Sequence, residues 1–249
     1  MTELHETILS EHVSLEQKSH PESLARTVLK LGSYAVQMTE VDRVPRLPSG
    51  ERENNAEHSY MLSLIAPALA YELSPHLDRG LIAQFANVHD LVEIKTGDVP
   101  TFAASAEELA QKAVREETAA HELAASLDPY TADLLMRYEA QQETEARFVR
   151  MVDKLLPLTL DILGPGERVM HEDYDVANPW QLHGNHQKLQ ERFSSMFPEF
   201  PELLAAHELL AQQFELHFTI NHASRAMRQS APKEDHLFRN DHTQPSADK

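Results

Sequence analysis

Apolar residues recur at intervals of three and four along most of this chain, which is the spacing that places them on one face of an α-helix. The first such run consists of Leu24, Val28, Leu31, Ala35 and Met38. No stretch shows a convincing alternation of apolar and polar residues, and only 7 glycines occur in 249 residues. Ala, Leu, Glu and Gln, which favour helices, are abundant. The sequence therefore predicts an all-α fold.

The same spacing, with the turn residues between runs, predicts where the helices lie. They are expected over residues 21–38, 57–73, 79–93, 105–126, 144–163, 186–196 and 202–220, with another beginning at Pro129. Asp78, Ser105 and Asp128 stand where helix N-terminal caps are needed, and Pro157 is expected to kink the helix over 144–163. Residues 39–55 and 164–184 contain the Pro and Gly residues typical of loops.

These elements form one domain with variable ends. A flexible N-terminal extension is expected over residues 1–20, followed by a helical core over 21–163. A C-terminal helical extension over 164–228 is expected to pack on that core. Residues 229–249 are polar and without pattern, which predicts a disordered tail.

Charge and composition exclude several classes of partner. The formal net charge is −18, from 22 Lys and Arg against 40 Asp and Glu, and such a field repels polymeric nucleic acid. No run of about 18 apolar residues is present, so no membrane span is expected, and a cytoplasmic protein is the default. The chain has no Cys, which excludes thiolate metal ligands and disulfides.

A polar constellation interrupts the apolar runs. Asp153 lies inside the apolar face of 144–163, where an unpaired charge is costly, so it needs a cation or a metal as its partner. Lys154 is adjacent and is not expected to share its helix face. His58 falls in the buried helix over 57–73, and the pair His89-Asp90 ends an apolar run.

Each of these residues has an ordinary explanation alone: a distant salt bridge for Asp153, a core histidine for His58, and chance for the dipeptide. Together they supply two nitrogens and two carboxylates from three helices, a set suited to Mn, Fe, Co, Ni or Zn with room for water. Glu93, one turn beyond the dipeptide, is close enough to transfer protons. Three arginines precede His58 and form a candidate anion clamp: Arg43, Arg46 and Arg52.

The motifs around these residues resemble a known family. His58 in Ala56-Glu57-His58-Ser59, His89-Asp90, and Asp153 in Met151-Val152-Asp153-Lys154 resemble the H…HD…D tetrad of the HD-domain metal-dependent phosphohydrolases. Within that superfamily the 5'-deoxynucleotidase group is the most similar. The shared features, which span residues 26 to about 163, are Arg43 ahead of His58, Glu93 with Thr96-Gly97-Asp98 and Pro100, and Tyr138-Glu139 with Glu145-Ala146 and Phe148-Val149.

The resemblance implies an HD-domain helical bundle that holds one divalent metal ion, among Mn, Co, Ni, Fe, Zn and Mg. By this resemblance the metal ligands are His58, His89, Asp90 and Asp153. Glu93 would be the catalytic carboxylate, Asp98 a further active-site acid and Arg43 a phosphate contact. Apart from the resemblance, Arg46 and Lys95 are candidates for additional substrate-binding cations. The group acts, typically as homodimers, on deoxynucleoside 5'-monophosphates, and an activated water removes the phosphate.

The chain also departs from this group, and alternative functions follow. Val44 stands where some members carry Trp, and residues 164–249 exceed the short members. Trp180, His183, Gly184 and Arg192 resemble a segment of longer HD hydrolases. Trp180, His183 and His186 are therefore candidates for a substrate-side wall, although surface or core roles are the more ordinary explanation.

Three alternatives remain open. A triphosphate hydrolase would need the extra cations Lys95, Arg46 and Arg52. A mixed-valence di-iron oxygenase would need about two more histidine ligands, and only His121 lies between Asp90 and Asp153. A non-catalytic nucleotide sensor is disfavoured because Glu93 and every expected ligand are present.

Overall fold

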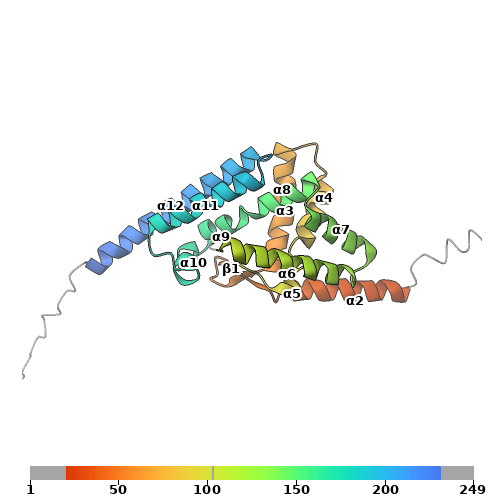
Figure 1. The fold of residues 1–249 in the computed structure, drawn as a ribbon. Helices are drawn as coiled ribbons and strands as arrows, with labels where there is room; N and C mark the ends of the chain where they lie inside the picture. The colour runs from red at the N-terminus through yellow and green to blue at the C-terminus, as the bar shows by residue number, and fades with distance from the viewer. Residues whose placement is uncertain (1–20, 103, 231–249) are drawn as a thin grey trace, which may run out of the picture.

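The computed structural model describes residues 21–102 and 104–230, and it confirms the all-α prediction apart from one small hairpin (Figure 1). The predicted extension over 1–20 and most of the predicted tail lie outside these residues. The helices are α2 (Pro21–Met38), α3 (Asn55–Leu73), α4 (Arg79–Val88), α5 (Glu93–Thr96), α6 (Ala106–Ala124), α7 (Pro129–Ala140), α8 (Thr144–Asp153), α9 (Leu156–Leu163), α10 (Gly166–Glu172), α11 (Pro179–Met196) and α12 (Pro201–Ser230). The strands are β1 (Asp42–Arg46) and β2 (Arg52–Asn54).

The prediction of a loop over 39–55 was wrong, because β1 and β2 pair there as an antiparallel hairpin. Asp42 lies opposite Asn54 and Arg46 opposite Arg52, with an irregularity between them. Pro45 is compatible with β1 because both strands of a two-stranded sheet are edge strands, where a missing N–H is tolerated. The hairpin leads directly into α3, where Asn54 accepts hydrogen bonds from the backbone N–H groups of Ala56 and Glu57.

Helix boundaries differ from the prediction at functionally important places. The helix expected over 79–93 ends at Val88, so His89 and Asp90 lie in a turn before α5. The helix expected over 144–163 breaks after Asp153, and Pro157 lies in the first turn of α9, where proline is tolerated. Residues 166–172, expected to be loop, form α10, and α11 begins at Pro179. The side chains of Asp78, Ser105 and Asp128 cap α4, α6 and α7 as predicted.

The main core is assembled from both halves of the chain. Buried residues of α3, α4, α7 and α8 pack with the end of α11, the start of α12 and the turn between these two helices. Large members of this core include Leu62, Phe85, Phe148, Phe197 and Phe200. Phe148 and Phe200 meet edge to face with ring centroids 5.4 Å apart. A second cluster joins α9 and α10 to α12, which runs beside α11 in Figure 1. The helices beyond residue 163 therefore complete the core of the helices before it.

None of the helices within residues 21–102 and 104–230 is long and apolar enough to cross a membrane.

Candidate metal centre and its pocket

Three of the four predicted metal ligands form a compact buried cluster. His58 lies in the second turn of α3, whose start is fixed by its Asn54 cap, while His89 and Asp90 follow the end of α4. One potential ligand atom of each residue lies within 4.8 Å of the other two. The Oδ2 atom of Asp90 is 3.0 Å from Nε2 of His89 and 3.9 Å from Nε2 of His58.

Asp153, the last residue of α8, joins this cluster through His58. Its Oδ1 atom is 2.8 Å from Nε2 of His58, and its Oδ2 accepts a hydrogen bond of 2.6 Å from Lys154. Burial alone would raise the pKa of Asp153, but Lys154, His58 and His89 together hold that pKa well below its ordinary value. The sequence prediction that Lys154 cannot serve Asp153 was wrong, because the long Lys154 side chain folds back from the end of α8 to reach the carboxylate of its neighbour.

The hydrogen bonding of His89 fits a metal ligand. Its Nδ1 atom lies 2.8 Å from the carbonyl oxygen of Ala86 and donates to it, which leaves Nε2 as the nitrogen with the free lone pair. This Nε2 atom is buried, and although Oδ2 of Asp90 lies 3.0 Å away, it makes no well-oriented hydrogen bond among the described residues. A lone pair directed into a cluster of carboxylates and imidazole is suited to a divalent cation.

Glu53 is a buried neighbour of the cluster that the sequence did not reveal. One of its carboxylate oxygens, Oε2, lies 3.3 Å from Nδ1 of His58 and 3.3 Å from Nε of Arg43. Its side chain is 1% exposed. A carboxylate behind a metal-binding imidazole favours the N–H on the ring nitrogen that faces it, which here is Nδ1. The other nitrogen, Nε2, is then presented to the metal.

Arg43, on β1, reaches the same cluster. Its Nη1 atom donates to Oδ2 of Asp90 at 2.5 Å and to Oδ1 of Asn55 at 3.2 Å, and it lies 3.7 Å from Oε2 of Glu93. Burial lowers the pKa of this guanidinium, but the surrounding carboxylates, first Asp90, raise it further, so the net pKa lies above its ordinary value. Arg43 is therefore a permanent positive charge at the edge of the cluster.

Glu93 begins α5 and is held by two partners. Asn55 donates a 2.8 Å hydrogen bond to its Oε2 atom, and Nζ of Lys112 lies 3.4 Å from its Oε1 atom. Burial, followed by the negative charge of Asp90, raises the pKa of Glu93 to about 8. A carboxyl group with such a pKa can exchange a proton near neutral pH.

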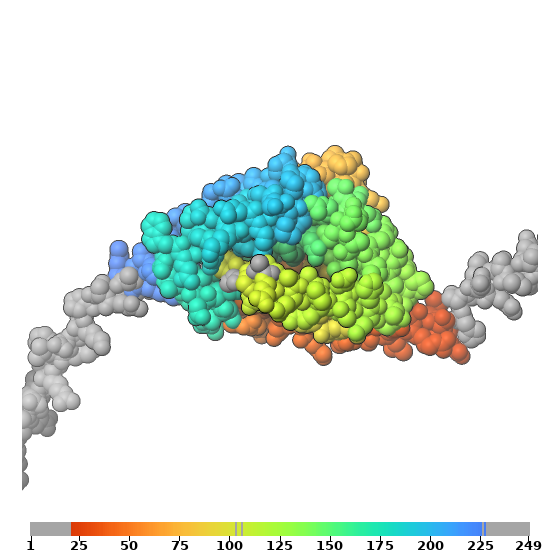
Figure 2. Space-filling view, in the orientation of Figure 1, coloured from red at the N-terminus to blue at the C-terminus, as the bar shows by residue number. Residues whose placement is uncertain are grey.

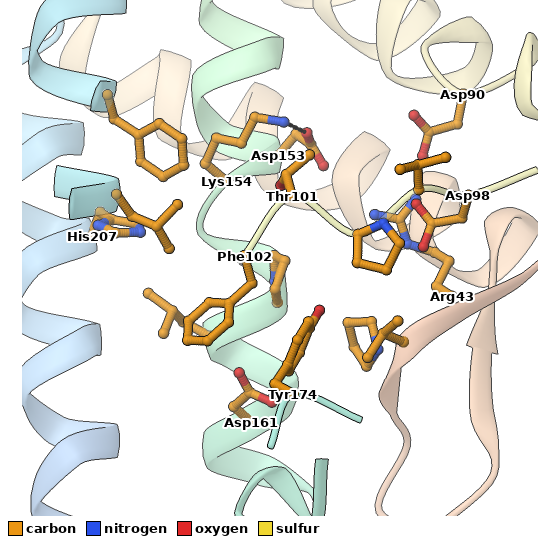
Figure 3. A pocket seen from close by; sticks show the side chains of 18 of the residues that line it. Arg43, Asp90, Asp98, Thr101, Phe102, Asp153, Lys154, Asp161, Tyr174 and His207 are labelled. Atoms are coloured by element: carbon orange, nitrogen blue, oxygen red, sulfur yellow. Dashed lines mark hydrogen bonds and ion pairs between the residues drawn. The ribbon is translucent and has the colours of Figure 1, made fainter. Parts of the chain in front are cut away.

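These groups line one end of a pocket with about 820 Å³ of free space, including its open mouth. Figure 2 shows the surface hollowed between α11 and α6, whose side chains His186, Leu189, Phe193 and Lys112 line the pocket. In Figure 3, Arg43, Asp90 and Asp98 lie at one end, and Asp161 and Tyr174 lie at another. Arg43, Lys112 and Lys154 supply positive charge to the pocket wall.

The structure does not place every predicted substrate residue at this pocket. Lys95 points toward α6, where it pairs with Glu122 at 2.7 Å, and its side chain is 41% exposed. Arg46 turns toward Asp173, 3.4 Å away, and neither Lys95 nor Arg46 contributes to the pocket wall. Lys112, for which the sequence offered no signal, approaches Glu93 from α6 and lines the pocket. It therefore supplies the positive charge that was expected from Lys95.

The candidate wall residues of the C-terminal extension also separate. Trp180 is 85% exposed and lies outside the pocket wall. His183 is half exposed and pairs with Glu215 at 2.9 Å. His186 is buried and does line the pocket, so one of the three candidates lies at the substrate side.

Comparison with known proteins supports this geometry. The family profile described as HD domain matches residues 37–197, more than half of the chain. The 5'-deoxynucleotidase VV1113 of Vibrio vulnificus (strain YJ016) is 30% identical over 132 residues, which cover 49% of this chain and 68% of that protein. The solved structure of a predicted metal-dependent phosphohydrolase from Magnetospirillum magnetotacticum MS-1 is 25% identical with a TM-score of 0.61, and the match covers 79% of this chain and 95% of that chain.

The matched range contains all four residues of the predicted tetrad. In the structure His58, His89 and Asp90 form one cluster, and Asp153 contacts it through His58. The predicted cofactor is confirmed in kind, because proteins of this family bind a divalent metal and the structure contains a buried His-His-Asp cluster able to hold one. The chain belongs to the HD-domain family and is a metal-dependent phosphohydrolase.

Proposed function

We propose that this hydrolase removes the phosphate from deoxynucleoside 5'-monophosphates. The observation that carries the proposal is the division of the pocket, with a metal site and cations at one end and aromatic side chains at the other. A phosphate fits the first end and a nucleoside fits the second. The similarity to a 5'-deoxynucleotidase over 68% of that protein supports the same substrate class.

His58, His89, Asp90 and Asp153 would hold the metal. When bound, a divalent ion supplies Lewis acidity, which polarises the phosphoryl group and lowers the pKa of water. Arg43 presents a fixed guanidinium to the phosphate, for which this group is suited by charge and shape.

Hydrolysis then requires the bond from phosphorus to the 5'-oxygen to break as a water oxygen bonds to phosphorus. We assign acceptance of the water proton to Glu93, whose buried carboxyl has a pKa near 8. Asp98 lines the same wall as the second acid and is assigned to protonate the leaving 5'-oxygen. Lys112 pairs with Glu93 and Lys154 with Asp153. Both lysines line the pocket and offset the negative charge of the phosphate.

The position of the other cations favours a monophosphate over a triphosphate. Arg46 and Arg52 both pair with Asp173, at 3.4 and 2.5 Å, and Lys95 pairs with Glu122. A triphosphate needs additional cations beyond the reacting phosphate, and these three candidates are engaged elsewhere.

The histidine count favours one metal over two irons. Within the described part of the chain, a single group of at least three clustered His, Asp or Glu ligands occurs, around His58, His89 and Asp90. His121 is exposed on α6 and does not line the pocket. Elemental analysis should therefore find one metal ion per chain, and two tightly held irons would contradict this assignment.

The decisive experiment is phosphate release from nucleoside mono-, di- and triphosphates, with Mn, Co, Ni and Mg each supplied to the metal-free protein. Deoxynucleoside monophosphates should give the highest kcat/KM. Asp153→Ala and His89→Ala should lose both bound metal and turnover, and full metal-dependent turnover in either variant would overturn the site. A protein that binds metal and nucleotide but releases no phosphate would instead be a sensor.

We also propose a homodimer, as in the group it resembles. Apolar residues of α2 are exposed in the single chain: Leu24 is 52%, Val28 70%, Leu29 74% and Val36 61% exposed. Light scattering should give twice the chain mass, and Val28→Glu with Leu29→Glu should shift it to the monomer value.

A further inference from the structure

A buried carboxyl group without a partner lies at the end of the pocket away from the metal ligands. Asp161, on α9, is 8% exposed, and its Oδ1 atom is buried without a hydrogen-bond partner among the described residues. Burial raises its pKa to about 7, and no neighbouring charge is among the causes. Burying a carboxyl group without a hydrogen-bond partner destabilises the folded protein. In a pocket wall, such a group is explained if a bound ligand supplies the missing partner.

The backbone around Asp161 is held in place by the start of α10. A Cβ atom at Gly166 would lie 2.4 Å from the carbonyl oxygen of Asp161 and 2.7 Å from its Cβ. Only glycine permits such a close approach without a shift of the main chain. The carboxyl group is therefore positioned by tight packing and does not hang from a mobile loop.

Aromatic rings and a second unpaired polar atom lie in the same part of the wall. The ring centroid of Phe102 is 4.8 Å from that of Tyr174 and 5.7 Å from that of His186. Nδ1 of His186 is 2.7 Å from Glu215, and this carboxylate favours the N–H on Nδ1. Its Nε2 atom, also buried and without a described partner, is left as a hydrogen-bond acceptor.

The pocket therefore combines flat apolar faces with two unpaired acceptors. A planar heterocycle can stack on the rings, and the acceptors require N–H donors. An exocyclic amino group carries two such donors. A sugar hydroxyl supplies a donor but no planar face to match Phe102 and Tyr174.

We propose that Asp161, together with Nε2 of His186, recognises the amino group of the substrate's base, so that amino-bearing bases are preferred. This inference rests on the proposed nucleotide substrate and deepens it. It assigns substrate selection to α9 and α11, which lie apart from the metal ligands in the chain. Figure 3 shows Asp161 beside Tyr174 and away from Asp90, which leaves the phosphate end free.

The test compares two nucleosides that differ only in the amino group, 2'-deoxyadenosine and purine 2'-deoxyriboside. Their binding to the metal-loaded full chain is measured by calorimetry, which does not depend on turnover. The wild-type protein should bind 2'-deoxyadenosine about tenfold or more tightly, since a site built for a hydrogen bond rejects an analogue that lacks it. Asp161→Leu should lose most of this preference, because only Nε2 of His186 remains as an acceptor, and it should retain its metal because Asp161 contacts none of the proposed metal ligands.

Asp161→Asn serves as the second variant, because its amide oxygen still accepts a hydrogen bond and should keep much of the preference. Asp175→Asn changes an exposed aspartate that does not line the pocket, so it is the matched control and should behave as the wild type. Equal binding of both nucleosides by the wild type, or a preference that is undiminished in Asp161→Leu, would overturn the inference. Failure of the proposed function is recognised separately, as a metal-loaded protein that releases phosphate from no mononucleotide.

Discussion

Replacing Glu53 by Gln should weaken metal binding although Glu53 is not itself a ligand. The substitution keeps the shape of the side chain but removes the charge 3.3 Å from both His58 and Arg43. At that distance and an effective dielectric constant of about 20, a full charge pair is worth about 5 kcal/mol. Only the part of this energy that orients the imidazole and raises its basicity contributes to metal affinity. For such supporting carboxylates that contribution is about 10- to 100-fold in affinity, or about 1.4 to 2.8 kcal/mol.

The assay is competition for the metal with a chromophoric chelator, using metal-free protein and the Glu53→Gln variant, with thermal unfolding recorded for both. Glu51→Gln is the matched control, because Glu51 is exposed beside the same hairpin. Its metal affinity should equal that of the wild type. Wild-type metal affinity in Glu53→Gln, accompanied only by a lower unfolding temperature, would refute the reasoning and leave Glu53 with a purely structural role.

Three further predictions follow from other parts of the structure. Lys112→Ala should lower kcat/KM by about tenfold or more, because it removes a partly buried cation beside Glu93, whereas Lys95→Ala should leave kcat/KM unchanged under saturating metal. Burial and, to a smaller extent, the charge of His186 lower the pKa of His207 to about 4. As the pH falls, the unfolded chain therefore protonates this histidine before the folded chain does. The free energy of unfolding should fall between pH 6.5 and pH 4 by up to about 3 kcal/mol. Urea unfolding at several pH values should show a shallower fall in His207→Gln, and an undiminished fall there would contradict the assignment. Phe148→Ala should reduce the free energy of unfolding by about 3–5 kcal/mol, because its ring is fully buried against Phe200, and a loss under about 1 kcal/mol in urea would be incompatible with that packing.

The clustering of the proposed metal ligands could be predicted because these residues violate the local pattern. Asp153 and His58 are polar residues inside apolar helical runs, and burying such groups demands a partner. The hairpin could not be predicted in the same way, because strands of five and three residues are too short to show an alternation. Glu53, at the centre of the shorter strand, was missed together with its strand.

The predicted cations show a different limit of sequence reasoning. Lys95 is two residues from Glu93, a spacing that directs side chains to different sides of a helix, whereas Lys112 reaches Glu93 from another helix. Asp161 gave no signal because its burial depends in part on the start of α10, which packs against it only in the folded chain. Local spacing therefore predicts ligands on one element, while partners from distant elements require the fold.

His58 and Asp153 are 95 positions apart along the chain, and their contact closes the metal site. A contact across so long a loop is expected to form late in folding, because the chain must lose conformational entropy to close the loop before the contact can stabilise it. The bound metal should therefore stabilise the native state without assisting the early steps, and free metal at 100 times its Kd should add about 2.7 kcal/mol. Bound metal should mainly lower the unfolding rate. Removing it with a chelator should therefore shorten the lifetime of the native protein far more than it slows folding.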